Sequence, residues 1–216
     1  LEFSGSLWHS RKDFYFGDLM SALLLSNYIS LVHDNSLWTP IGPIDGWSLR
    51  LTIGPTFDFQ RSKLHNYAGL LDFRYYYRIN HYFSIAQRSM IWLNDGVDIR
   101  RFYIGGSWGL RGYAINQIYG RKAILLNQEL RFPFAKSLML NIGTENIGFA
   151  PIRGALFIDA GNAWDYSYPG LRGSFGFGLR GLFMGGIVLR LDIGKQTDFR
   201  SISENWFTQF FFGWDF

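Results

Sequence analysis

Three residues in the second half of the chain have the types needed to join a loop to a β-sheet through buried charge. Arg111 lies in the glycine-rich segment GGSWGLRGY (105–113), Glu129 in NQELRFPF and Asp159 in FIDAGNAW. A guanidinium offers a planar fork of N–H donors that two carboxylates can share. The four glycines around Arg111 let the backbone turn tightly and approach such partners. The sequence therefore predicts a contact of Arg111 with Glu129, Asp159 or both; the alternative is a solvated loop charge.

Alternation in the flanking segments predicts which way the carboxylates point. Glu129 shares its face with Asn127 and Arg131, whereas the opposite face is mostly large and apolar. Because successive side chains of a strand point to opposite faces, Glu129 is predicted to point inward with the polar residues. Asp159 shares its face with Phe157, so alternation alone leaves its direction open.

Enzymatic chemistry has little support in the sequence. There is no Cys, the four His residues are scattered without metal-ligand spacing, and no GxSxG, HExxH, P-loop or dinucleotide motif occurs. The small-residue segment 173–176 contains a Ser, but it belongs to an alternating strand with no helical pattern after it. We therefore expect no enzymatic activity, no cofactor and no metal site.

Period-two alternation, the pattern of β-strands, runs from one end of the chain to the other. The sequence predicts tight turns at 80–81 and 184–186, and its longest connection, 94–122, contains Arg111. The alternation predicts an all-β chain with strands at 1–8, 18–34, 47–59, 67–79, 82–93, 123–134, 152–164, 171–183, 185–197 and 206–216.

The same alternation fits a soluble β-sandwich and an antiparallel transmembrane β-barrel, and three features favour the barrel. Strands of ~10–13 residues are long for a soluble sheet but suit a tilted barrel wall. Several apolar faces also end in Trp, Tyr or Phe, as the interfacial girdles of barrels do. Short turns on one side and long loops on the other match periplasmic turns and extracellular loops.

Composition and charge exclude several other classes of protein. Aromatic residues make up 19% of the 216 residues, which excludes disorder. The net charge of +4 comes from interspersed charges with no basic run longer than a pair, so no nucleic-acid partner is expected. The longest apolar candidate, 19–32, is interrupted by polar residues, so no transmembrane helix is expected. The absence of an initial Met and of a signal peptide predicts a mature, trimmed or partial chain.

The last predicted strand carries a second candidate signal. It alternates Phe210, Phe212, Trp214 and Phe216 against a mixed face and ends on Phe. This pattern resembles the terminal signal of outer-membrane barrels, which the assembly machinery reads as an added strand. The alternative is a plain edge strand, although a flat apolar edge of this kind would make a soluble protein prone to aggregate.

Four segments, GGSWGLRGY, NQELRFPF, FIDAGNAW and the last predicted strand, follow one another in the chain. In this order they resemble the C-terminal barrel of the BamA-type outer-membrane superfamily, also called the bacterial surface antigen family. GLRGY resembles the family's arginine-glycine-aromatic motif in the sixth extracellular loop, and NQELRFPF and FIDAGNAW resemble the two strands after it. The resemblance extends from about Ser26 to the end of the chain. The segment SLVHDNSLWTPIGPIDGW (30–47) resembles members fused behind a TolB-like propeller.

The resemblance implies a position for the loop. In the family the loop folds back into the barrel lumen and its Arg docks on the wall. Carried over to this sequence, Arg111, Gly112 and Tyr113 would form a loop lock with Glu129 and Asp159.

The resemblance also implies closure at sixteen strands. Residues 1–216 are then expected to form a single outer-membrane β-barrel domain that is incomplete at its N-terminal side. The rival interpretation is a complete, smaller barrel of about ten strands, since even strand numbers from 8 upward occur in bacterial barrels.

Three functions follow as hypotheses. The resemblance implies an outer-membrane protein that inserts or translocates polypeptides, with outer-membrane lipid, client polypeptides and the barrel assembly machinery as partners. The alternative is a passive pore, or a membrane anchor for a fused periplasmic domain. A soluble β-sandwich binding module is the third interpretation.

Overall fold

Most described residues belong to one layer of β-structure. A computed structural model describes residues 2–12, 20–97, 99, 101–136, 138–142, 145–149, 151–183 and 187–213. Over these ranges the chain forms strands and turns, and no helix is long and apolar enough to cross a membrane.

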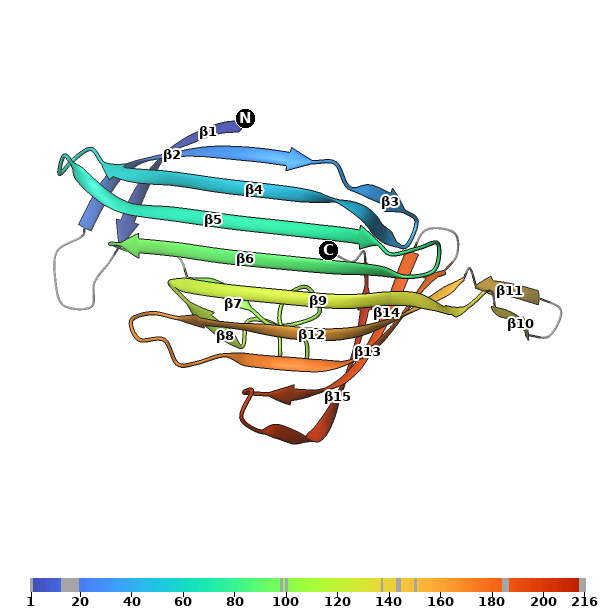
Figure 1. The fold of residues 1–216 in the computed structure, drawn as a ribbon. Helices are drawn as coiled ribbons and strands as arrows, with labels where there is room; N and C mark the ends of the chain where they lie inside the picture. Colours follow the sequence, from blue (N-terminus) through green and yellow to red (C-terminus); the bar gives the residue numbers. More distant parts are fainter. Residues whose placement is uncertain are drawn as a thin grey trace.

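Ten long strands form one antiparallel sheet in which each strand pairs with the next long strand along the chain (Figure 1). The predicted all-β antiparallel architecture is confirmed, and each predicted strand has one counterpart. The ten are β1 (Glu2–Lys12), β2 (Met20–Asp34), β4 (Gly42–Asp58), β5 (Lys63–Arg78), β6 (Ser84–Gly96), β9 (Lys122–Ala135), β12 (Ile152–Trp164), β13 (Arg172–Phe183), β14 (Ile187–Thr197) and β15 (Ile202–Phe212).

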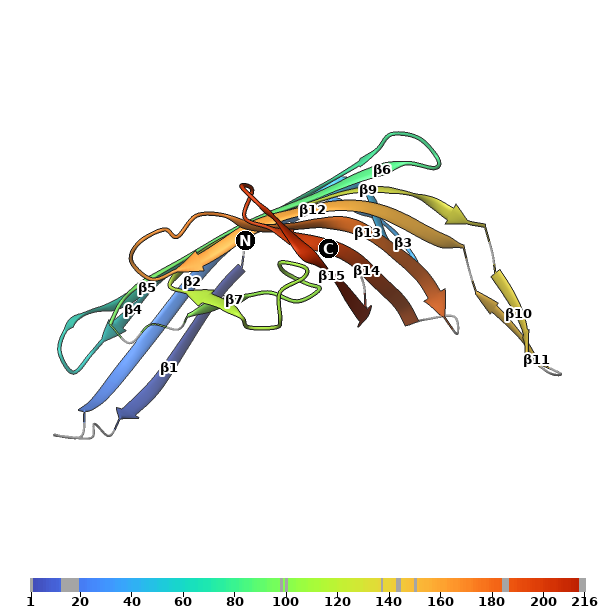
Figure 2. The same ribbon diagram turned by 90° about the horizontal axis from the view of Figure 1, so that it is seen from below.

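The sheet is open in this structure. Among the described residues, β1 pairs only with β2 and β15 pairs only with β14, so the two edge strands do not meet. Seen from below, the sheet is arched, and the loop that carries β7 and β8 lies under the arch (Figure 2). The sheet therefore has a concave face, covered in part by this loop, and a convex outer face.

Five short strands were not predicted. They are β3 (Leu37–Thr39), β7 (Phe102–Ile104), β8 (Ile118–Gly120), β10 (Leu138–Ile142) and β11 (Glu145–Phe149). Three of them have only three residues, too few for an alternation to be recognised. β3 pairs with the start of β4, and β7 pairs with β8 within the long connection before β9.

Several strand bounds differ from those predicted. β4 begins at Gly42 rather than at 47, because Gly42 pairs with Thr39 of β3. β15 begins at Ile202, four residues early, because Thr197 pairs with Ile202. The turn before β6 is longer than predicted, because the Asn80 side chain accepts the backbone N–H groups of residues 82 and 83.

The two faces of the sheet differ in polarity, as alternation predicted. On β9 the residues Leu125, Asn127, Glu129 and Arg131 are buried, whereas Leu130 is exposed on the outer face. Arginines are among the largest fully buried side chains, while many large aliphatic and aromatic residues are exposed. Soluble proteins rarely bury Arg and expose contiguous apolar surface. This inverted arrangement is the one expected when lipid covers the outer face.

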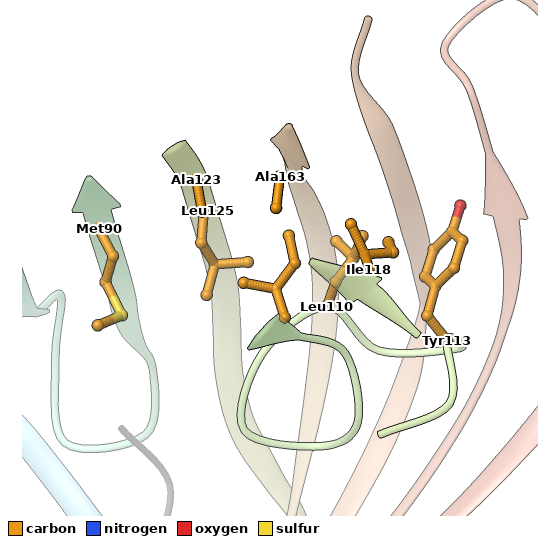
Figure 3. Packing of buried hydrophobic residues seen from close by; sticks show 8 residues of the cluster. Met90, Leu110, Tyr113, Ile118, Ala123, Leu125 and Ala163 are labelled. Atoms are coloured by element: carbon orange, nitrogen blue, oxygen red, sulfur yellow. The ribbon is translucent and has the colours of Figure 1, made fainter. Parts of the chain in front are cut away.

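The apolar core lies between the loop and the concave face (Figure 3). Leu110 and Tyr113 of the loop and Ile118 of β8 pack against side chains from the sheet. The remaining buried members of the cluster are Met90, Ile104, Ala123, Leu125 and Ala163. This packing holds the loop against β6, β9 and β12, next to the carboxylates that the sequence singled out.

Candidate functional site

Arg111 lies at the tip of the loop and contacts both predicted carboxylates. Its Nε and Nη2 each donate to one oxygen of Asp159 at 2.5 Å, and its Nη1 donates to Oε1 of Glu129 at 2.6 Å. The backbone N–H of Arg111 also lies 3.3 Å from Oδ2 of Asp159. All three side chains are fully buried. The guanidinium is thus bidentate to one carboxylate and linked to a second, which is the strongest geometry available to an Arg.

The position of Asp159 resolves the direction that alternation left open. Asp159 points to the concave face, and so does Phe157 on the same strand. The Phe157 ring centroid lies 3.9 Å from Cζ of Arg111, so the ring forms a cation–π contact with the guanidinium. The aromatic residue that made Asp159 ambiguous in the sequence is therefore part of the arginine's binding surface.

Asn127 links the loop backbone to the same carboxylate. Its Nδ2 donates to Oδ1 of Asp159 and to the backbone carbonyl of Gly109, both at 2.9 Å. Asn127 is buried on the same face of β9 as Glu129. Because it fixes the orientation of Asp159, Asn127 extends the predicted site by one positioning residue.

Glu129 is shared by several arginines. Arg180 Nη2 donates to Glu129 Oε1 at 2.6 Å, and Arg131 Nε donates to Oε2 at 2.9 Å. Arg190 lies 3.8 Å from the same carboxylate and donates to Asp192 at 2.6 Å. These side chains form what we call the inner charge cluster: Arg111, Glu129, Arg131, Asp159, Arg180, Arg190 and Asp192.

Three members of this cluster, Arg180, Arg190 and Asp192, were not predicted as site residues. Arg180, Arg190 and Asp192 stand on the polar faces of alternating strands, which is the signal that could have identified them. Their convergence on Glu129 depends on strand register, in which Arg180 lies opposite Arg190 and next to β12. Register is set by non-local pairing and is not visible in one sequence.

Electrostatics keep Arg111 charged. Complete burial opposes the charged form, but the carboxylates of Asp159 and Glu129 outweigh this penalty and raise the pKa of Arg111 above its ordinary value. The loop is therefore held by a permanent cation whose burial is compensated by two anions.

Gly112 and Tyr113 contact the C-terminal strands of the sheet. The Gly112 backbone has φ 84°, a left-handed value that favours glycine, and a Cβ there would lie 2.6 Å from the ring of Phe207. The Tyr113 hydroxyl lies 3.3 Å from the carbonyl oxygen of Gly173 and donates to it. Burial raises the pKa of the Tyr113 hydroxyl, which favours its neutral, hydrogen-donating form.

A second arginine reaches the loop from the other side. Arg88 Nη1 donates to the backbone carbonyl of Trp108 at 3.2 Å, while Arg88 Nε and Nη2 donate to Asp72. Arg74 also donates to Asp72, at 2.7 Å. The loop tip is thus in contact with side chains from β6 as well as from β9 and β12.

The candidate C-terminal signal is described only in part. Phe210 and Phe212 are exposed on the outer face, with ring centroids 4.9 Å apart in an edge-to-face arrangement. Trp214 and Phe216 lie outside the described residues. The tight turn predicted at 184–186 lies outside them as well.

The arrangement is suited to holding a loop. Over the described residues, no group of three or more His, Asp or Glu side chains could hold a metal ion. The inner charge cluster contains only arginines and carboxylates, which are paired with each other and shielded from solvent.

Comparison with known proteins agrees with the fold and with the motifs. A scan against protein families matches the Omp85 superfamily domain over residues 31–210, from near the end of β2 into β15. A search of curated proteins found no match. Members of this superfamily are typically outer-membrane proteins. Because the match spans most of the chain and includes the loop and the carboxylates that bind it, the protein belongs to the Omp85 superfamily.

Proposed function

We propose that this protein is an outer-membrane β-barrel that inserts or translocates other polypeptides, with its arginine-glycine-tyrosine loop locked inside the barrel. The observation that carries this proposal is the Arg111 contact with Glu129 and Asp159 in a chain of the Omp85 superfamily. The apolar outer face supports placement in lipid.

We further propose that the complete barrel closes at sixteen strands, with the loop lock inside its lumen. An open sheet leaves unpaired backbone groups at both edges, and such groups are not tolerated in the hydrocarbon region. Additional strands between β15 and β1 would satisfy them. The segment 30–47 supports membership of the subfamily fused to a TolB-like propeller.

The proposed partners follow from the same features. Outer-membrane lipid would cover the exposed apolar residues, client polypeptides would be handled by the barrel, and the barrel assembly machinery would read the C-terminal strand. The proposed role involves no catalysis and no cofactor. A passive pore or a membrane anchor for a periplasmic domain is the alternative.

The test compares two loop arginines in the full-length protein reconstituted into liposomes. Arg111→Ala removes the buried cation, whereas Arg101→Ala removes a cation from an exposed pair with Asp165. The measurement is the yield of heat-modifiable, folded barrel from an unfolded outer-membrane protein, relative to protein-free liposomes. We expect Arg111→Ala to lower the yield, Arg111→Lys to restore part of it, and Arg101→Ala to leave it unchanged.

Two outcomes would contradict the proposal. If the wild-type protein gives no more folded barrel than empty liposomes, the insertion part of the proposal is contradicted. If Arg111→Ala is folded and fully active, the buried contact has no part in the function.

A further inference from the structure

We propose that Gln209 couples the docked loop to the last strand, β15, so that docking of the loop and attachment of β15 stabilise each other. The coupling follows from contacts within the fold and does not depend on the proposed function. It goes beyond the proposed function because it assigns a coupling role to residues outside the arginine motif and its carboxylates.

Gln209 binds backbone atoms of two consecutive residues of the loop tip, Gly112 and Tyr113. Its Oε1 accepts the backbone N–H of Gly112 at 3.1 Å, and its Nε2 lies 3.3 Å from the carbonyl oxygen of Tyr113 and donates to it. One side-chain amide thus contacts the backbone directly beside Arg111. Since both contacts are to backbone atoms, they depend on the path of the loop rather than on its side chains.

The neighbours of Gln209 add to the same contact. Gln196 of β14 donates from Nε2 to the carbonyl oxygen of Gly112 at 2.5 Å. On β15 itself, Phe207 fills the space beside Gly112, and Phe211 packs edge-to-face on Trp108 with centroids 5.3 Å apart. Three successive inward residues of β15, at 207, 209 and 211, therefore face the loop.

The loop joins β15 to two strands with which β15 does not pair. Arg111 is bound to Glu129 on β9 and to Asp159 on β12, whereas Gln209 lies on β15. In the sheet, β13 and β14 separate β12 from β15. Moving β15 away from the sheet must therefore break the loop contacts or displace the loop from its carboxylates.

β15 has few other supports in the described structure. It pairs on one side only, with β14, and that pairing is interrupted by a register shift between Lys195 and Thr197. The loop supplies a second set of contacts to the same strand. Two events that share contacts are thermodynamically linked, and the coupling is reciprocal. Releasing Arg111 should loosen β15, and weakening Gln209 should loosen the loop.

The test measures amide hydrogen exchange in the lipid-embedded, full-length protein without any client polypeptide. We expect Arg111→Ala to accelerate exchange roughly tenfold in residues 206–212 as well as in 105–113, with β5 unchanged. We expect Gln209→Ala to accelerate exchange in 105–113. The matched control is Thr208→Ala, because Thr208 is the exposed neighbour on the outer face and should leave the loop unchanged.

One further variant keeps the test decisive. Gln209→Glu keeps the acceptor for Gly112 and loses the donor to Tyr113, so its effect should lie between wild type and Gln209→Ala.

The coupling is overturned if Arg111→Ala loosens the loop while β15 exchanges as in wild type, or if Gln209→Ala leaves the loop protected. Because the measurement uses no client, its failure is distinct from a failure of the insertion assay.

Discussion

At the residue scale, the site is built around one carboxylate that several arginines share. Glu129 accepts hydrogen bonds from Arg111, Arg131 and Arg180, and its burial makes each of these contacts sensitive to loss of a partner. Replacing one member of a buried ion pair costs about 3–5 kcal/mol when the remaining charge has no other partner. Here the remaining arginines share the charge of Glu129, so single losses should fall at or below the lower end of that range.

Arg153 and Arg180 provide a matched pair for measuring what the loss of one arginine at Glu129 costs. They lie directly opposite each other on β12 and β13, but only Arg180 donates to Glu129. Arg153 is half-buried and has no hydrogen-bond or ion-pair partner within the described ranges. Like charges placed directly opposite each other are destabilising.

We therefore expect Arg180→Gln to lower the free energy of unfolding by about 2–3 kcal/mol. Arg153→Gln should change it by less than about 0.5 kcal/mol, or raise it slightly. Urea unfolding of the protein in lipid vesicles measures both. Equal losses for the two variants would show that Glu129 does not depend on Arg180.

Gly112 allows a prediction that separates backbone strain from steric exclusion. Gly112 and Gly170 both have positive φ, at 84° and 96°, but a Cβ at Gly170 would meet nothing within 4 Å. Gly170→Ala should therefore cost only the left-handed backbone penalty, about 1 kcal/mol. Gly112→Ala should cost more, because its Cβ also collides with Phe207. Thermal unfolding of the two variants checks this, and a similar loss at both positions would exclude the collision.

At this scale the sequence predicted the central contact and missed its surroundings. Arg111, Glu129 and Asp159 could be chosen from residue type and alternation. Phe157 made the direction of Asp159 uncertain, because the sequence gives no reason for an aromatic side chain on an inward, polar face. The structure gives the reason, since the guanidinium of Arg111 lies over the Phe157 ring. Gln209 could not be recognised as a loop contact in the sequence, because it is uncharged, belongs to none of the motifs and binds only backbone atoms.

At the element scale, alternation predicted all ten long strands, and large apolar residues are exposed on the outer face of most of them. Loop-associated strands were not predictable in this way. β7 and β8 form because they pair with each other and pack on the sheet. Such tertiary contacts are not visible in local sequence propensity.

The outer face yields a prediction at this scale. Leu156 is exposed on β12, opposite Leu130 and Phe177 on its two neighbouring strands. If this face lies in the hydrocarbon region, Leu156→Arg should destabilise the protein by about 2–4 kcal/mol near the midplane. Ile115→Arg, at an exposed loop position, is the control and should have little effect. Unfolding in lipid vesicles measures the difference, and equal stability of both variants would mean that lipid does not cover β12.

At the scale of the whole molecule, buried charged side chains lie within the arch of the sheet, whereas many large apolar side chains are exposed outside it. The sequence could predict this inversion, since strand length and aromatic positions favoured a barrel over a sandwich. The sequence could not predict which strands form the edges of the sheet or whether the sheet closes, because edge pairing depends on which strands come together in space. The arched sheet places the loop where several strands can bind it at once.

The sequence distances spanned by the loop contacts have a consequence for the rate at which the protein folds and unfolds. Arg111 and Gly112 bind residues 18, 48 and 97 positions later in the chain. These contacts close only after β9, β12 and β15 have been paired, so they form late and are absent from an early transition state. Contacts of this kind slow unfolding and leave folding almost unchanged. Arg111→Ala should therefore accelerate unfolding in lipid while the refolding rate stays near that of wild type, and the docked loop sets how long the assembled sheet persists.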